Sequence, residues 1–261
     1  MGMNQAILVV SFGTTFQETM EKNIVPTEQA VQAAFPQRKV VRAFTSGVVM
    51  RRLKERYGVE IDDVPQALQR LVDEGITDVV IQPTHVMNGE EFDKLCRLAQ
   101  PFAQVLDQMV IGSALLSSAE DFQQVAQALC QYIPQPKPGQ AIVFMGHGTS
   151  HPANAVYAAL EYVFRDMGRK DVAIGTVEGY PGFEEVCRRL EEMGDIREVI
   201  CTPLMMVAGD HACNDLAGDE EDSWKSMLQQ RGYQVSCQLM GLGEMPQIRE
   251  IFVRHIREAT E

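Results

Sequence analysis

Val143-Phe-Met-Gly-His-Gly-Thr-Ser150 combines an apolar run with a glycine-containing turn that holds a histidine. Val9-Val-Ser-Phe-Gly-Thr-Thr15 repeats this pattern, with Gly13 in the place of Gly148. An apolar run that ends in such a turn is typical of a buried parallel strand that leads into a helix. The two copies therefore predict two related α/β units, each opened by one of these strands.

Strand and helix patterns alternate along the whole chain, which predicts βαβ units and parallel sheets. In the first series we expect strands at Ala6–Phe12, Lys39–Phe44, Asp78–Gln82 and Gln108–Ala114, and helices at Val25–Ala34, Gly47–Tyr57, Pro65–Glu74 and Glu90–Gln104. In the second we expect strands at Gln140–Met145, Asp171–Val177, Glu198–Pro203 and Gln234–Gly241, and helices at Pro152–Met167, Gly182–Met193, Asp219–Arg231 and Pro246–Thr260.

Two more pairs of segments align between the series. They are Ala43-Phe-Thr-Ser-Gly47 with Gly175-Thr-Val-Glu-Gly179, and the Pro83–Glu91 segment with Pro203–His211. The Pro/Gly cluster at 134–139 is the best linker signal. We therefore expect an N-terminal unit at 1–133, a linker at 134–139 and a C-terminal unit at 140–261, with the last helix free to pack on the N-terminal unit. One continuous sheet with chance similarity is the alternative.

Composition narrows the class of protein. The chain has 261 residues and a formal charge of −13, which argues against nucleic acid and anionic membrane surfaces as partners. No apolar run is long enough to span a bilayer, and the N-terminus lacks the basic region of a signal peptide. The six cysteines include no Cys-x-x-Cys pair, which indicates reduced thiols. We expect a cytoplasmic protein.

The alignment exposes an asymmetry between the two units. The second unit carries His147, Glu178 and His211, each after a different predicted strand. The aligned positions of the first unit hold Phe12, Ser46 and Glu91. Because the carboxyl ends of parallel strands share one edge of a sheet, the three groups of the second unit can converge. Two imidazoles and a carboxylate suit a divalent transition metal and leave coordination positions open.

Other residues leave more than one interpretation open. His85 follows a strand of the first unit and either lines a site or is structural, and His151 fits a surface or supporting place. His255 lies among arginines in the last predicted helix, so we expect it to face solvent. The loop Ser11–Thr15 can hold a carboxylate with backbone N–H groups and hydroxyls, but no nucleotide-binding motif follows any strand.

At these residues the chain resembles the anaerobic sirohydrochlorin cobaltochelatases (CbiK-type), class II tetrapyrrole chelatases of the early-cobalt route to cobalamin. The resemblance covers nearly the whole chain. It is carried by Leu8-Val-Val-Ser-Phe-Gly-Thr14, Arg42–Gly47, Asn88-Gly-Glu90, Val143–Gly148, Pro203–His211, Asn214-Asp215 and Asp222-Ser-Trp224. It implies two flavodoxin-like, three-layer α/β/α halves whose parallel sheets face a central cleft. The implied activity is insertion of Co2+ into sirohydrochlorin.

The same resemblance implies the site residues. His147, Glu178 and His211 are expected to bind cobalt, and His147 is also implied as a proton acceptor. We expect the substrate carboxylates at loop amides rather than at a basic surface, because the whole chain is acidic. The residues expected to bind the tetrapyrrole are Ser11, Phe12, Gly13, Thr14, Thr15, His85, Met87, Asn88, Gly89, Glu90, Gly148 and Thr149.

Several functions compete with cobalt insertion. His/Glu ligation does not select the metal, so a sirohydrochlorin ferrochelatase for siroheme is one alternative, and Fe2+ or Ni2+ can replace Co2+ in vitro. A non-catalytic tetrapyrrole or metal carrier is another. A metal-dependent hydrolase is disfavoured because the sequence offers no carboxylate cluster for paired metals. Self-association into a homo-oligomer stays open.

Overall fold

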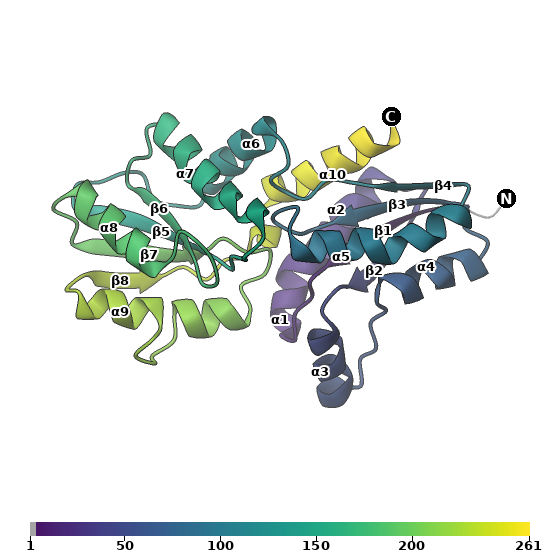
Figure 1. Ribbon diagram of the computed structural model, residues 1–261, viewed down its shortest axis with the longest axis horizontal. Helices are drawn as coiled ribbons and strands as arrows, with labels where there is room; N and C mark the ends of the chain where they lie inside the picture. The colour runs from purple at the N-terminus through teal and green to yellow at the C-terminus, as the bar shows by residue number, and fades with distance from the viewer. Residues whose placement is uncertain (1–3) are drawn as a thin grey trace. The chain divides into compact units, whose positions relative to one another are not determined.

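Four apolar strands of the first half pair in the order β2-β1-β3-β4 in the computed structural model, which describes residues 4–261 (Figure 1). The strands are Gln5–Ser11 (β1), Lys39–Phe44 (β2), Asp78–Pro83 (β3) and Gln108–Ile111 (β4). All neighbouring strands run parallel. Strands β1 and β3 are buried along almost their whole length, as expected for central strands covered on both faces.

The second half repeats this arrangement in the order β6-β5-β7-β8, again with parallel neighbours. Its strands are Gln140–Gly146 (β5), Val172–Thr176 (β6), Glu198–Pro203 (β7) and Gln234–Cys237 (β8). The predicted pair of parallel α/β units is therefore confirmed. Strands β4 and β8 are shorter than expected, because the chain turns away from each sheet after four paired residues.

Strand register confirms the predicted internal repeat at individual residues. The matching pairs are Ser11–Phe44 with Gly146–Thr176, and Val10–Pro83 with Met145–Pro203. Side-chain bonds repeat as well: Gln5 donates to Asp78 at 2.8 Å, and Gln140 donates to Glu198 at 2.9 Å. The two units thus share their register, and positions aligned by sequence are equivalent in space within each unit.

The helices mostly fall where the sequence predicts them. The first unit has α1 (Gln17–Thr19), a π-helical turn (Met20–Ile24), α2 (Val25–Ala34), α3 (Gly47–Tyr57), α4 (Val64–Asp73), α5 (Glu90–Ala99), a 3-10 turn (Gln100–Gln104) and α10 (Pro246–Thr260). The second has α6 (Ala119–Cys130), a 3-10 turn (Pro152–Ala155), α7 (Val156–Asp166), α8 (Phe183–Met193), a π-helical turn (Ala212–Leu216) and α9 (Trp224–Gln230). A 3-10 turn at Leu242–Glu244 precedes α10.

Capping explains where several helices begin. Helix α6, which the sequence patterns did not predict, starts with a capping box in which Ser118 and Asp121 bond each other's backbone N–H groups. Helix α9 begins later than expected, because Ser223 caps it by accepting from the N–H of Ser226 at 3.1 Å. The acidic residues before it therefore lie outside the helix. The segment 17–24 is also helical where no helix was expected.

The two compact units divide the chain differently from the expected boundary at 134–139. One unit contains the described residues through Ser117 together with Gly243–Glu261, and the other contains Ser118–Leu242. Helix α6 belongs to the second unit because it packs on α7, while α10 packs on α2 and β3 of the first unit (Figure 1). Each unit is therefore closed by a helix that follows the last strand of the other half of the sequence.

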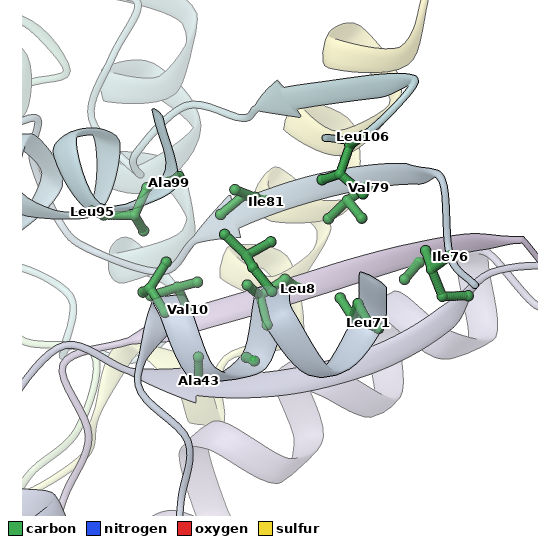
Figure 2. Close-up of a cluster of buried hydrophobic side chains, with 14 residues drawn as sticks. Leu8, Val10, Ala43, Leu71, Ile76, Val79, Ile81, Leu95, Ala99 and Leu106 are labelled. Atoms are coloured by element: carbon green, nitrogen blue, oxygen red, sulfur yellow. The ribbon is translucent and has the colours of Figure 1, made fainter. Parts of the chain in front are cut away.

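Apolar clusters fill both faces of the sheets. In the first unit, Leu8, Val10 and Ile81 of the strands pack against Leu71 of α4 and Leu95 of α5 (Figure 2). The opposite face packs against α2 and α10. Between residues 4 and 261, no helix is both long and apolar enough to cross a membrane.

His255 corrects an expectation about solvent exposure. The helical pattern placed it on a solvent face, but its side chain is buried in α10, 2% exposed. Its Nδ1 lies 3.1 Å from the carbonyl oxygen of Ser113, to which it donates. The prediction was wrong because it relied on the neighbouring arginines. Helix α10 is charged on one face and buried on the other, and His255 lies on the buried face.

Candidate metal-binding site

Two histidine rings meet at the carboxyl edge of the second sheet. His147 directly follows β5, and His211 lies in the loop after β7, the neighbouring strand. The ring centroids are 4.6 Å apart and the ring planes are nearly perpendicular, at 85°. Because β5 and β7 are adjacent and parallel, their ends bring together two residues that are 64 positions apart in sequence (211 − 147).

Each ring is held by a hydrogen-bond acceptor on its Nδ1. The Nδ1 of His147 is 2.8 Å from the carbonyl oxygen of Gly148, and that of His211 is 2.5 Å from Oδ2 of Asp215. A carbonyl or a carboxylate accepts but does not donate, so both Nδ1 atoms carry a hydrogen. Nε2 is then the nitrogen of each ring that can offer a lone pair to a metal ion. Metal-ligating histidines commonly have this arrangement, because the second nitrogen fixes ring and tautomer.

Glu178 follows β6, the other neighbour of β5. Its backbone N–H donates to the carbonyl oxygen of His147 at 2.8 Å, and its Oε2 is 4.0 Å from the Nδ1 of His147. The carboxylate is 60% exposed. Over residues 4–261, no group of three or more His, Cys, Asp or Glu side chains is already arranged to hold a metal ion. The imidazoles are thus in contact, and the carboxylate stands at the edge of the pair.

The loops that carry His147 and Glu178 are fastened to each other. Asn154, which is buried, accepts from the N–H of Thr149 at 2.9 Å and donates to the carbonyl oxygen of Tyr180 at 2.5 Å. Gly148 has a φ of +81°, and a Cβ there would lie 2.6 Å from Cβ of Thr176. The glycine is therefore required by both backbone conformation and space. Sequence reasoning placed Gly148 and Thr149 here but did not identify Asn154.

Asp215 is the second residue that sequence reasoning left without a role. It was part of the motif but was not assigned to His211. The signal was present, because the spacing His211-x-x-x-Asp215 places both side chains on one side of a helical turn. The turn is the π-helical segment Ala212–Leu216, which His211 precedes. A histidine and a carboxylate four residues apart after a strand end can thus indicate an oriented imidazole.

The loop after β1 forms part of the equivalent edge in the first unit. Gly13 has a φ of +98°, and a Cβ there would lie 2.5 Å from the ring of Phe44. Phe12 is 47% exposed, whereas Ser11 and Thr14 are buried. The Oγ of Ser11 has no hydrogen-bond partner within the described part of the chain. Thr15 is half-buried.

The loop after β3, residues 85–90, lies beside the β1 loop because β1 and β3 are neighbours. Asn88 donates to Oγ of Ser117 at 3.1 Å, and the carbonyl of His85 accepts from the N–H of Leu115 at 2.9 Å. Gly89 precedes α5, Glu90 is its first residue, and Met87 is half-buried.

His85, in that loop, is half-buried as a residue, but its two ring nitrogens are buried. Both ring nitrogens are shielded from solvent and have no hydrogen-bond partner among residues 4–261. Burial lowers the pKa of His85 to about 4, so the ring is neutral at physiological pH. It therefore does not present a nitrogen at the surface of the unit. The expected tetrapyrrole-binding residues fall into one group in the first unit and a smaller group beside His147.

Comparisons with known proteins agree with this architecture. The chain shares its fold with SirB from Bacillus subtilis with Fe3+, at a TM-score of 0.66 and 15% identity, covering 98% of this chain and 95% of that one. It also shares it with CbiX, the terminal enzyme for biosynthesis of siroheme in denitrifying bacteria, at a TM-score of 0.57 and 17% identity, covering 98% and 99%. The fold is thus one found in chelatases.

Sequence comparison narrows this class. Residues 5–261 match the family model of cobalt chelatase (CbiK). The chain is 44% identical over 257 residues to sirohydrochlorin cobaltochelatase of Salmonella typhimurium, covering 98% of this chain and 97% of the relative. It is 34% identical over 261 residues to sirohydrochlorin cobaltochelatase CbiKC of Nitratidesulfovibrio vulgaris, covering 98% and 90%. The chain belongs to the cobalt chelatase (CbiK) family.

Proposed function

We propose that this chain is an enzyme that inserts Co2+ into sirohydrochlorin. The observation that carries the proposal is the contact between His147 and His211, with an acceptor on each Nδ1 and a lone pair on each Nε2. The names of the two relatives support the same metal and the same tetrapyrrole. Cobalt is a substrate here, so its site must both bind the ion and release it.

The proposed ligands of the incoming ion are Nε2 of His147, Nε2 of His211 and the carboxylate of Glu178. Glu178 is 60% exposed, so its side-chain torsions can turn the carboxylate toward the imidazoles at little steric cost. The imidazoles are 43% and 39% exposed. Three protein ligands on an open edge leave coordination positions for water and then for pyrrole nitrogens. A more enclosed site would hold the ion too firmly to pass it on.

Insertion exchanges one Co2+ for two pyrrole N–H protons, so it also needs proton acceptors. Pyrrole N–H is a very weak acid, and its proton leaves readily only as the metal approaches the ring nitrogens. Imidazole accepts and releases protons near neutral pH, which suits this exchange. We assign the first proton to Nε2 of His147 and the second to Nε2 of His211, each of which is released as Co2+ passes to the ring nitrogens. Glu178 supplies negative charge that offsets the cation.

The carboxylates of sirohydrochlorin require neutral or positive surroundings in a chain of net charge −13. We place some of them at the backbone of the Ser11–Thr15 loop, which contains no acidic residue. The segment Gly148–Thr149 is a second candidate. The Asn88–Glu90 loop is less suited, because the first turn of α5 carries Glu90, Glu91 and Asp93. The exposed ring of Phe12 offers an apolar surface to the macrocycle.

The test follows the absorbance of sirohydrochlorin after addition of Co2+. Wild type is compared with His147→Ala and His211→Ala, and His151→Asn is the matched control. His151 precedes the 3-10 turn in the same loop, where its ring accepts from the N–H of Ala153 at 3.1 Å, and asparagine can cap that turn. We expect both alanine variants to lose insertion while His147→Ala still binds sirohydrochlorin. Wild-type insertion rates in these variants would refute the assignment.

Parallel assays decide the metal and the class of function. Insertion with Co2+, Fe2+ and Ni2+ ranks the metals, which the His/Glu ligands alone do not. Fe2+ as the strongly preferred metal would point to siroheme synthesis instead. Stoichiometric binding of sirohydrochlorin or metal without turnover would indicate a carrier and would contradict the proposed enzyme.

A further inference from the structure

Two cysteine thiols stand side by side away from the histidine pair. Cys201 of β7 and Cys237 of β8 are direct register partners in the second sheet. Both side chains belong to the same apolar cluster, so they lie on the same face of the sheet. A side-chain hydrogen bond joins the two thiols. Cys201 is fully buried, and Cys237 is half-buried.

The spacing of these strands fits a covalent link between the two residues. Neighbouring strands lie about 4.8 Å apart, so directly paired Cα atoms fall within the range of about 4.4–6.8 Å seen across disulfides. The Cβ atoms must come within about 3.5–4.5 Å of each other, the range seen across disulfides. Strand β8 is four residues long and stands at the end of the order β6-β5-β7-β8, where it can shift toward β7.

The surroundings give the two thiols different reactivity. The hydrogen bond with Cys201 and the nearby ammonium of Lys225 lower the pKa of Cys237, although burial opposes them. The pKa of Cys201 is raised, by that same hydrogen bond and by burial. In contrast, burial raises the pKa of the exposed Cys213 and takes that of Cys187 to about 11. Cys237 is thus the accessible nucleophile, and Cys201 is the thiol within its reach.

We propose that Cys201 and Cys237 form an oxidation-sensitive dithiol that hydrogen peroxide converts into a disulfide between β7 and β8. The Cys237 thiolate attacks one oxygen of the peroxide, which breaks the O–O bond and gives a sulfenic acid and hydroxide. The Cys201 sulfur then attacks the sulfenic sulfur. The S–S bond forms, the S–OH bond breaks, and the Cys201 proton leaves with the hydroxyl group as water. Two electrons pass from the thiol pair to the peroxide, and external thiols reverse the reaction.

The link would act close to the proposed metal loop. Cys201 lies two residues before Pro203, the last residue of β7, and the chain then continues to His211. Backbone bonds already tie the chain after β8 to this region, from the N–H of Gln238 to Cys201 and from that of Leu242 to Met205, both at 2.9 Å. We expect the disulfide to tighten this end of the sheet and to slow cobalt insertion. This consequence rests on the proposed function, whereas disulfide formation does not.

The experiment treats the full chain, carrying Cys213→Ser, with hydrogen peroxide and analyses it by non-reducing trypsin digestion and mass spectrometry. Cys213 must be removed because residues 198–225 form one tryptic peptide that contains both Cys201 and Cys213. Cys237 lies in the peptide 232–249. We expect these two peptides to become linked with the loss of two hydrogen masses, and dithiothreitol to separate them.

Matched variants make the result specific. Adding Cys237→Ser or, independently, Cys237→Ala should abolish the linked peptides, whereas adding Cys96→Ser, in the other unit, should leave them unchanged. The proposal is overturned if the linked peptides do not form while Cys237 is oxidised singly, or if another cysteine pair links first. Cobalt insertion is measured separately on the reduced chain. A chain that forms the disulfide with peroxide but inserts no cobalt when reduced would refute the proposed function and leave the proposed dithiol standing.

Discussion

Removing the carboxylate that orients His211 should weaken cobalt binding without disturbing the fold. Asp215 accepts a hydrogen bond from Nδ1 of His211 at 2.5 Å, and Asp215→Asn keeps an acceptor but loses the charge. Groups that hold a metal-ligating histidine typically contribute 10–100-fold to metal affinity. Both side chains are exposed by about two-fifths, 39% and 42%, so solvent screens part of this effect. We therefore expect the affinity for Co2+ to fall about 10-fold, which corresponds to about 1.4 kcal/mol of binding free energy.

Titration calorimetry with Co2+ measures this loss directly, and Asp215→Ala should bind more weakly still because no acceptor then fixes the tautomer. Asp210→Asn is the matched control. Asp210 lies on the same segment and carries the same charge, but it accepts from Asn214 at 3.0 Å instead of from an imidazole. Equal weakening in Asp210→Asn and Asp215→Asn would show that net charge alone matters. Such a result would refute the orienting role of Asp215.

Three further predictions concern stability, each measured by urea unfolding. His85→Phe should flatten the pH dependence of the free energy of unfolding. His85 gains its proton below about pH 6.5 in the unfolded chain but only below about pH 4 in the folded one, so acid favours unfolding of the wild type. Between pH 7 and pH 5 the wild type should therefore lose about 2 kcal/mol more stability than the variant. Equal losses would contradict this. Gly146→Ala should cost about 1–3 kcal/mol, since its Cβ would lie 2.2 Å from the buried Tyr157 ring, whereas Gly47→Ala, with open space, should not destabilise. Asn154→Ala should cost about 1–3 kcal/mol because Thr149 and Tyr180 lose a partner, and the exposed Asn88→Ala should cost less. If Asn154→Ala and Asn88→Ala lost similar amounts of stability, the bridging role of Asn154 would be refuted.

Local sequence patterns were reliable wherever one segment carries its own signal. The apolar runs that became β1 and β5, and the glycine turns after them, predicted two parallel sheets. Helix α6 was not predicted, because its amphipathic pattern is only moderate and lies between a loop and a proline cluster. Ser118 and Asp121 nevertheless form a recognisable capping box at its start. The acidic run before α9 was assigned to the helix, but Ser223 caps it later.

The contact between His147 and His211 could be anticipated because parallel strands end at a common edge, a rule that needs no coordinates. Which nitrogen of each ring carries the hydrogen could not be anticipated from the sequence. The acceptors on their Nδ1 atoms, the carbonyl of Gly148 and the carboxylate of Asp215, depend on side-chain and loop conformation. The buried environment of His85 likewise depends on packing by other segments, and periodicity within its own loop contains no such information.

The sequence by itself determined two related parallel α/β units, the register of their repeat and the one-sided placement of His147, Glu178 and His211. These follow from periodicity and strand ends, which are local properties of the chain. Tertiary structure alone decided that α6 and α10 close the units formed by the opposite halves of the sequence, because helices choose their partners by burying apolar faces across long separations. Tertiary structure also decided which ring nitrogen of each histidine is available to a metal ion, because folding places a hydrogen-bond acceptor beside the other nitrogen of the same ring.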